Sequence, residues 1–136
     1  MARKRMMSPN FFISATMNAL PMHTMLTFAG FWCFADDYGR AEDDENLVRA
    51  AVWPRRKCMT DKKVRADMDM LVDAGPLCQY TVCDVRLIHA TSWDEHQSIG
   101  HPTPSKLPPC EKHEPEAWEK FLTSTDQALH KFRAFS

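Results

Sequence analysis

Hydrophobic residues recur with a helical period over the first half of the chain. Behind Pro21, apolar side chains spaced three and four residues apart predict a first helix, because they form one stripe along it. This helix is expected to stop at residues 36–40, where Gly39 can adopt the left-handed conformation that closes a helix. Four carboxylates at residues 42–45 then precede a second, shorter helix that ends at Pro54, since acidic side chains complement the positive end of a helix.

A third helix and a β-hairpin follow. Thr60 offers a hydroxyl as the N-cap of this helix, and Gly75 ends it. Its predicted buried face consists of Val64, Met68, Leu71 and Val72. The period then changes from helical to two over residues 77–82 and 85–90, which predicts a hairpin. Because its Cys83-Asp84 turn lacks glycine, the turn type stays open, and so does a loop longer than two residues.

The order helix, helix, helix, hairpin predicts an α+β fold of the winged helix-turn-helix type, with a three-helix core and the hairpin as the wing. Residues 1–92 form this predicted domain. Residues 93–114 are rich in proline and histidine and are interpreted as an extended arm, because prolines exclude a continuous helix or a central strand. An amphipathic helix is expected over residues 115–136, with its apolar stripe folded back onto the core or paired in a homodimer.

Size and composition are those of one globular domain. The chain has 136 residues, of which 44% are hydrophobic and 26% charged, values that exclude a largely disordered chain. No apolar run is long enough to span a membrane, and the basic N-terminus lacks the apolar segment of an export signal. The five cysteines form no CxxC pair, so a disulfide framework is not expected. These features predict a soluble cytoplasmic protein without a membrane partner.

The net charge of −1 hides an uneven distribution of charged residues. Residues 1–65 carry eleven Lys/Arg and seven Asp/Glu (+4), whereas residues 66–136 carry six and eleven (−5). A basic first half points to an anionic partner such as nucleic acid. Solvated surface charge gives the same pattern, so the distribution alone does not decide between them.

Two segments near the N-terminus have a distinctive sequence, KRMMSPNFF at residues 4–12 and FAGFWCFADDYGR at residues 28–40. Both resemble the opening of a family of phage helix-turn-helix proteins, similar to the N-terminal domain of DnaD-like phage replisome organisers. The Val52-Trp53-Pro54 break, the LVDAG helix end at residues 71–75 and the strand end Leu87-Ile88-His89 match the pattern in the same order. The resemblance extends over residues 1–109.

The resemblance implies a viral protein of the host bacterial cytoplasm that binds double-stranded DNA in replication initiation or transcriptional regulation. The sequence departs from the family pattern in two ways, which limit the functions that the resemblance implies. Pro76 stands where an aliphatic residue is usual, and no second domain of the kind that recruits a helicase loader follows. We therefore carry over the DNA-binding half alone.

Basic residues in four places are the candidates for DNA contacts. The turn before the third helix carries Arg55, Arg56 and Lys57, which are placed to meet phosphates. The other candidates are a flexible N-terminal arm of Arg3, Lys4 and Arg5, the start of the third helix at Thr60, Lys62, Lys63 and Arg65, and Arg86 in the wing. Because Asp69 and Asp73 repel phosphates, contacts are expected at the beginning of that helix.

Metal-ligand residue types gather near the C-terminus, at His96, His101, Cys110 and His113. The spacing Cys110-x-x-His113 can bind zinc from a turn. The wide interval between the first two histidines differs from zinc modules that have two close pairs. Surface histidines and one free thiol explain the same residues, so no metal ligand and no cofactor is assigned.

The sequence contains no motif of a common enzyme class. GxSxG, HExxH, the P-loop and the dinucleotide-binding glycine pattern are all absent, and the four glycines stand singly. Helix capping explains the carboxylates at residues 42–45 without a nuclease site. We therefore predict a binding protein and not an enzyme. An alternative stays open, in which a phage interaction module uses its acidic C-terminal half to bind and redirect a host replication or transcription protein.

Overall fold

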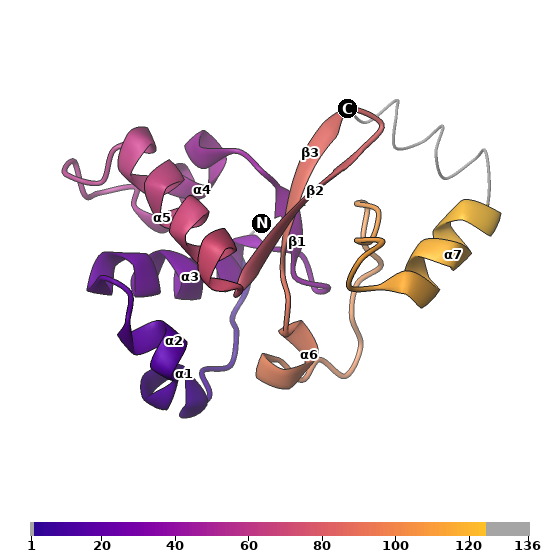
Figure 1. The fold of residues 1–136 in the computed structure, drawn as a ribbon, viewed down its shortest axis with the longest axis horizontal. Coiled ribbons are helices and arrows are strands. Elements are labelled where there is room, and N and C mark those ends of the chain that lie inside the picture. The colour runs from indigo at the N-terminus through magenta and orange to yellow at the C-terminus, as the bar shows by residue number, and fades with distance from the viewer. Residues whose placement is uncertain (1, 125–136) are drawn as a thin grey trace.

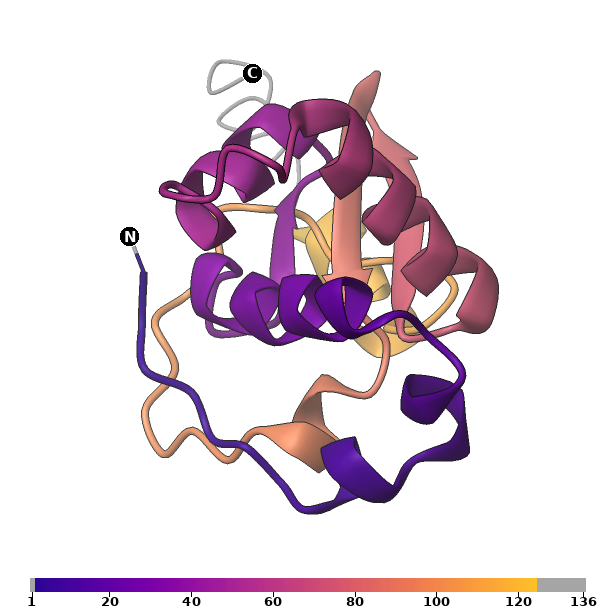
Figure 2. The same ribbon diagram turned by 90° about the vertical axis from the view of Figure 1, so that its left-hand side faces the viewer.

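A layer of three helices covers one face of a small antiparallel sheet, and the C-terminal part of the chain lies on the other face (Figure 1). The computed structural model describes residues 2–124 of the chain. It is an α+β structure with seven helices and three strands within these residues. Figure 2 shows the helical layer in front of the sheet. None of the helices in the described part of the chain is both long and apolar enough to cross a membrane.

The first long helix, α3 (Met22–Phe34), follows Pro21 as predicted and ends directly before the predicted stop at residues 36–40, but its C-cap is Ala35 and not Gly39. Gly39 lies in the turn that follows, with φ +77°, and a Cβ there would come within 2.7 Å of the Trp93 ring. Glycine is therefore required by the close approach of Trp93 as well as by the backbone. The turn leads into β1 (Arg40–Glu42), a strand that the hydrophobic pattern does not predict.

The next two helices begin and end where their caps predict. Helix α4 (Glu45–Val52) begins behind Asp44, whose side chain accepts from the backbone N–H groups of Asn46 and Leu47. Helix α5 (Asp61–Ala74) has Thr60 as its N-cap and ends at Gly75, which has φ +110°. The predicted face is confirmed, since Val64, Met68 and Leu71 are buried and Val72 is partly buried.

Helix α5 also buries a carboxylate that the sequence does not reveal. The side chain of Asp67 is fully buried against α3, where its two oxygens accept hydrogen bonds from the hydroxyls of Thr24 and Thr27, each 2.7 Å long. His23 Nδ1 lies 2.8 Å from one of these oxygens. This polar cluster fixes the register of α3 against α5, because a buried carboxylate has to keep its partners.

The predicted hairpin consists of β2 (Leu77–Val82) and β3 (Val85–Ala90), and the sheet order is β1-β3-β2. Its loop has two residues, Cys83 and Asp84, and both have positive φ, 52° and 66°, as in a type I′ turn. Strand β3 lies in the middle of the sheet, and its two faces contact different parts of the chain. Ile88 and Ala90 face the helices, whereas Leu87 belongs to a second apolar cluster on the opposite side.

The remaining helices within residues 2–124 are short. They are α1 (Asn10–Ile13), α2 (Ala15–Asn18), α6 (Trp93–His96) and α7 (Pro115–Thr123). Helix α7 begins at Pro115 as predicted, and its Trp118 and Phe121 pack on the second apolar cluster with Val82 and Leu87. The stripe positions Thr125, Leu129 and Phe132 lie outside the described residues.

The predicted arm, residues 93–114, contains α6 and otherwise little regular structure, but it lies against the body of the domain. Trp93 is buried in the main core, and the backbone oxygens of Leu107 and Pro108 accept hydrogen bonds from Arg40 and Tyr80. Figure 1 shows this segment beyond the sheet, opposite the helical layer. The arm therefore covers a sheet face that would otherwise be open to solvent.

Candidate functional site

The loop between α4 and α5 carries three cations that lie free on the surface. Arg55, Arg56 and Lys57 are all exposed, and none of them makes an ion pair with another residue in the range 2–124. The loop projects from the helical layer at the left of Figure 1. We call these three residues the basic turn.

Two more cations stand on the first turn of α5. Lys62 and Lys63 are exposed and, like the basic turn, have no ion-pair partner in the described part of the chain. The Thr60 hydroxyl caps the helix by accepting from the Lys63 N–H at 3.3 Å. The neighbouring Asp61 lies 3.9 Å from Arg49. The basic turn, Lys62 and Lys63 together form what we call the basic surface.

Further along α5, Arg65 differs from the basic surface because its charge is matched within the chain. Its Nη2 lies 2.8 Å from Asp43 Oδ1 and 2.9 Å from Glu45 Oε2. Burial lowers the pKa of Arg65, but hydrogen bonds to Glu45 and Asp43 outweigh that effect and the net shift is upward. The pKa of Glu45 is lowered, first by its own backbone N–H and then by Arg65.

Asp43 is the centre of this group. Its side chain is only 1% exposed, and it accepts from Gln79 Nε2 at 3.0 Å and from Arg86 Nη2 at 3.1 Å in addition to Arg65. Arg86 itself is largely exposed. The sequence predicted Arg65 and Arg86 as DNA contacts, but the structure shows that both hold a buried carboxylate. Asp43, expected among the helix-capping carboxylates, instead links α5 to the hairpin.

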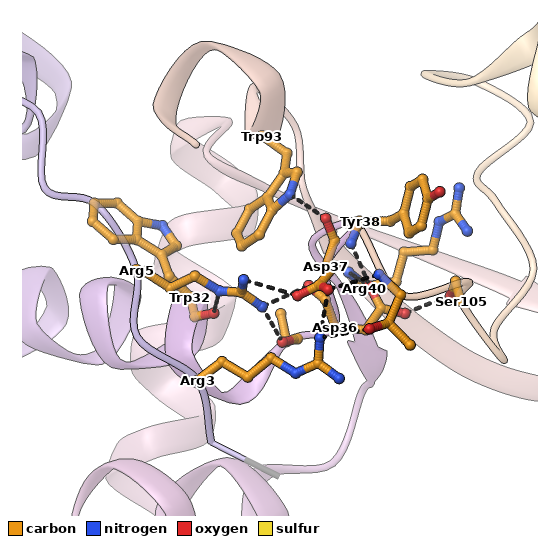
Figure 3. Close-up of polar contacts among 11 residues, drawn as sticks. Arg3, Arg5, Trp32, Asp36, Asp37, Tyr38, Arg40, Trp93 and Ser105 are labelled. Atoms are coloured by element: carbon orange, nitrogen blue, oxygen red, sulfur yellow. Dashed lines mark hydrogen bonds and ion pairs between the residues drawn. The ribbon is translucent and has the colours of Figure 1, made fainter. Parts of the chain in front are cut away.

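The N-terminal cations form a second such group around Asp37 (Figure 3). The Arg5 side chain is 5% exposed, and its Nη1 lies 3.0 Å from Asp37 Oδ1. It also donates to the backbone oxygens of Trp32, Ala35 and Asp36 and stacks on the Trp93 ring at 5.0 Å. The predicted flexible arm is therefore wrong for Arg5, which is held inside the fold.

Arg3 is also paired with Asp37, although its side chain is 39% exposed. The backbone N–H of Thr103 donates to the same carboxylate at 2.9 Å. This N–H, followed by Arg5 and Arg3, holds the pKa of Asp37 well below its usual range despite the opposing effect of burial. Lys4, the third residue of the predicted arm, is exposed. We call Arg3, Arg5, Asp37 and Thr103 the Asp37 network.

A second contact fixes the N-terminal segment further along. The side-chain amide of Gln97 accepts from the Met6 N–H at 2.8 Å and donates to the Met6 carbonyl at 2.9 Å. Figure 2 shows the two segments running side by side. The first residues of the chain are thus bound to the arm as well as to the turn behind α3.

The histidine and cysteine group considered in the sequence is brought together only in part. Cys110 Sγ and His113 Nδ1 lie 3.7 Å apart. His96, however, stacks on Trp32 with ring centroids 6.0 Å apart, and His101 is exposed. The four residues considered from the sequence, His96, His101, Cys110 and His113, therefore do not form one site.

Two residues of the hairpin take the places of the distant histidines. Cys78 and His89 join Cys110 and His113 in one cluster, in which the four ligand atoms all lie within 4.8 Å of one another. Burial, followed by the nearness of His113, lowers the pKa of His89 to about 4. Burial and then Cys110 raise the pKa of the Cys78 thiol to about 11.

A signal for this cluster does exist in the sequence. If the hairpin turn has two residues, Cys78 and His89 become direct cross-strand partners, and the structure has this register. The open turn type left that pairing unassigned. Two residues eleven positions apart in the chain therefore form a close pair that spacing along the sequence does not show.

Comparisons of the chain with family models, curated proteins and solved structures each found no match. Three features of the described residues thus remain as candidates for chemistry or binding: the basic surface, the Asp37 network and the Cys/His cluster. The Asp37 network has its charges matched internally. The basic surface does not, and it is the feature suited to meet an external anion.

Proposed function

We propose that this chain is a winged-helix protein that binds double-stranded DNA through the basic surface. The order α3, β1, α4, α5, β2, β3 and the sheet order β1-β3-β2 support this assignment. In it, α4 and α5 are the helix-turn-helix, α5 is the recognition helix, and the β2-β3 hairpin is the wing.

The observation that carries the proposal is the contrast among the basic residues. Arg3, Arg5, Arg65 and Arg86 each face a buried carboxylate of the same chain. The five cations of the basic surface have no such partner within residues 2–124, and all five lie in the loop before α5 or on its first turn. A cluster of unmatched cations at the start of a recognition helix favours phosphate binding, because neutralised phosphates release their counterions.

The distribution of charge along α5 indicates how DNA would lie. Lys62 and Lys63 stand at its beginning, whereas Asp69 and Asp73 are exposed further along the helix. Phosphates therefore favour the first turn of α5 and the basic turn, and the acidic end of the helix points away from the backbone. Contacts concentrated on phosphates give affinity with modest sequence preference.

The biological setting of the proposal comes from the family resemblance. Phage helix-turn-helix proteins of the DnaD-like type imply replication initiation or transcriptional regulation in a bacterial host. Of the two halves of a replisome organiser, only the DNA-binding one is proposed for this chain.

A second candidate, a module that binds a host protein, is favoured by apolar side chains on the helical layer. Met22 is 81% exposed and Leu26 is 56% exposed, and they lie four residues apart on one side of α3. An apolar surface of this kind suits a protein partner better than a polyanion. The two candidates differ in salt dependence, since an apolar interface is far less sensitive to salt than phosphate contacts are.

The test is binding of a labelled random-sequence duplex, measured by fluorescence anisotropy over a series of salt concentrations. The wild type is compared with Arg55→Ala/Arg56→Ala/Lys57→Ala. We expect the triple variant to lower the slope of log Kobs against log salt by about 2.7, because each lost phosphate contact contributes about 0.9.

The matched control is Lys106→Ala/Lys112→Ala/Lys120→Ala, which removes the same charge from exposed positions that are not predicted DNA contacts. This variant should retain most of the wild-type slope. Absence of binding by the wild type at low salt would refute the proposal. An equal loss in both triple variants would show that net charge, and not the basic surface, is responsible.

A further inference from the structure

The Cys/His cluster on the second face of the sheet has the composition of a structural zinc site. Cys78 and His89 come from neighbouring strands, and Cys110 and His113 from the turn before α7. We propose that these four side chains bind one zinc ion and thereby fasten the C-terminal segment to the hairpin. The inference is separate from DNA binding and does not depend on it.

The distances between the four ligand atoms fit tetrahedral coordination of one ion if the side chains move slightly closer together. With bonds of about 2.3 Å to sulfur and about 2.0 Å to nitrogen, the ligand atoms of a Cys2His2 site lie about 3.3 to 3.8 Å from one another. The Cys110 Sγ to His113 Nδ1 distance of 3.7 Å already falls in this range. The full set lies within 4.8 Å, so shifts of about 1 Å in side-chain position complete the tetrahedron.

His89 provides the most specific observation. It is 2% exposed, and its Nδ1 lies 3.2 Å from the carbonyl oxygen of Ala90. Donation to that oxygen places the ring proton on Nδ1 and leaves the lone pair on Nε2. Nε2 is buried and has no hydrogen-bond partner among the described residues. A histidine that donates one nitrogen to a backbone carbonyl and offers the other to a metal is the usual arrangement in zinc sites.

The backbone brings the ligands together as two close pairs. Cys78 and His89 are opposed in the antiparallel register of β2 and β3, and so project from the same face. The Glu114 N–H donates to the Cys110 carbonyl at 2.8 Å, which closes a single helical turn and places Cys110 and His113 on one side. One pair is thus adjacent across a sheet and the other across a turn.

The charge of the cluster balances when zinc is bound. Two thiolates neutralise Zn²⁺, and two histidines add no charge in their neutral form. Glu114, whose N–H donates to the Cys110 carbonyl, is paired with Arg40, and this pair is also neutral as a unit. A neutral complex suits a place where Cys110 and His89 are buried, because a net charge there would be costly.

Four protein ligands complete the coordination sphere, so the site would be structural and not catalytic. A groove lined by Cys78, Cys110 and Trp118 gives the ion access from solvent. A disulfide between the two cysteines is the competing use of the same sulfurs. It would leave Nε2 of His89 without a partner and His113 without a role.

The test is the metal content of the full chain, purified without a histidine tag and without added metal, measured by elemental mass spectrometry. We expect about one zinc per chain, as for other four-ligand sites. Replacing the zinc with Co²⁺ under reducing conditions should give the visible absorption of tetrahedral cobalt together with a thiolate charge-transfer band. This measurement needs no variant, so it does not depend on whether a substituted chain folds.

Variants then assign the ligands. Cys110→Ser and His113→Ala should bind zinc at least about tenfold more weakly, because each removes a direct ligand. Cys58→Ser and His101→Ala are the matched controls, since both residues are exposed and outside the cluster, and they should retain the wild-type content.

Three results would overturn the proposal. One is a wild type without zinc that also gives no tetrahedral cobalt spectrum. Another is an intact mass short by two hydrogens, with a peptide that joins Cys78 to Cys110. The third is a zinc content that falls in His101→Ala and persists in His113→Ala.

Discussion

Two groups of cations look alike in the sequence and behave differently in the fold. Residues 3–5 and residues 55–57 are both runs of arginine and lysine, and both are predicted DNA contacts. In the first group, Arg5 and Arg3 bind Asp37, and the Arg5 side chain is nearly inaccessible. In the second, all three side chains stand in solvent without an ion-pair partner in residues 2–124.

The difference comes from what each segment meets and not from the arginines themselves. Residues 3–5 run past the turn behind α3, where one carboxylate and three backbone oxygens accept from Arg5. The basic turn lies in a projecting loop, and the acidic residue that follows it in the sequence, Asp61, lies 3.9 Å from Arg49. A run of cations therefore marks a binding surface only where the chain itself offers no anion.

The largest expected effect is on the Asp37 network. Arg5→Met should lower the free energy of unfolding by about 3 kcal/mol, because it leaves a buried carboxylate and several buried carbonyls short of donors. Urea unfolding measures the change. Lys4→Met, at an exposed neighbouring position, should change stability by less than about 0.5 kcal/mol. Equal losses of unfolding free energy in the two variants would show that the buried ion pair of Arg5 does not stabilise the fold.

The pH dependence of the same network should be next in size. Because folding lowers the pKa of Asp37, its carboxylate stabilises the fold above the unfolded-state pKa, near 4, and this contribution is lost as the pH falls toward the folded value. Asp37→Asn should therefore cost about 2 kcal/mol at pH 7 and progressively less below about pH 4. Thermal unfolding of both proteins between pH 7 and pH 2.5 checks this, and a gap that stays constant would argue against it.

A smaller effect is expected within α5, which contains both kinds of cation. Arg65→Gln should destabilise the fold by about 1.5 kcal/mol, since Asp43 keeps Gln79 and Arg86 but loses its closest charge. Lys62→Gln, on the exposed side of the same helix, should be close to neutral. Chemical denaturation of both variants gives the comparison, and a larger loss in Lys62→Gln would reverse the assignment of roles.

The smallest effect on stability is expected in the basic turn itself. Arg55→Ala/Arg56→Ala/Lys57→Ala should shift the free energy of unfolding by less than about 0.5 kcal/mol, because the three side chains are exposed and make no ion pair within residues 2–124. Its effect should appear only in DNA binding. If calorimetry showed that this variant loses several kcal/mol of unfolding free energy, the basic turn would be part of what stabilises the fold, as Arg5 is.

Much of the helical layer could be predicted from the sequence. Helices α4 and α5 and the hairpin follow from apolar periodicity, caps and a terminating glycine, all of which are local signals. Strand β1 was missed because its three residues are too few to show a period. Its position depends on pairing with β3, a contact between segments more than forty residues apart.

The buried carboxylates could not be predicted from local sequence signals. Asp37, Asp43 and Asp67 resemble surface residues in any hydrophobicity pattern, yet each is buried with specific donors. Their partners come from distant segments, so only the tertiary fold reveals them. For the same reason, four of the predicted DNA-contacting arginines turned out to be structural partners of two of these carboxylates, Asp37 and Asp43. The basic turn, Lys62 and Lys63 remain accessible as predicted contacts, and so do Lys4 and Thr60.

The paired hydrogen bonds between Met6 and Gln97 have a practical consequence for anyone who expresses this protein. The first seven residues would pass for a dispensable leader, and trimming the gene to begin at Ser8 would seem harmless. Such a shortened protein would lose both hydrogen bonds between Met6 and Gln97. It would also lose the Arg5 guanidinium that is paired with Asp37. Fusion partners and purification tags should therefore be separated from the N-terminus by a linker, so that residues 3–6 can still make these contacts.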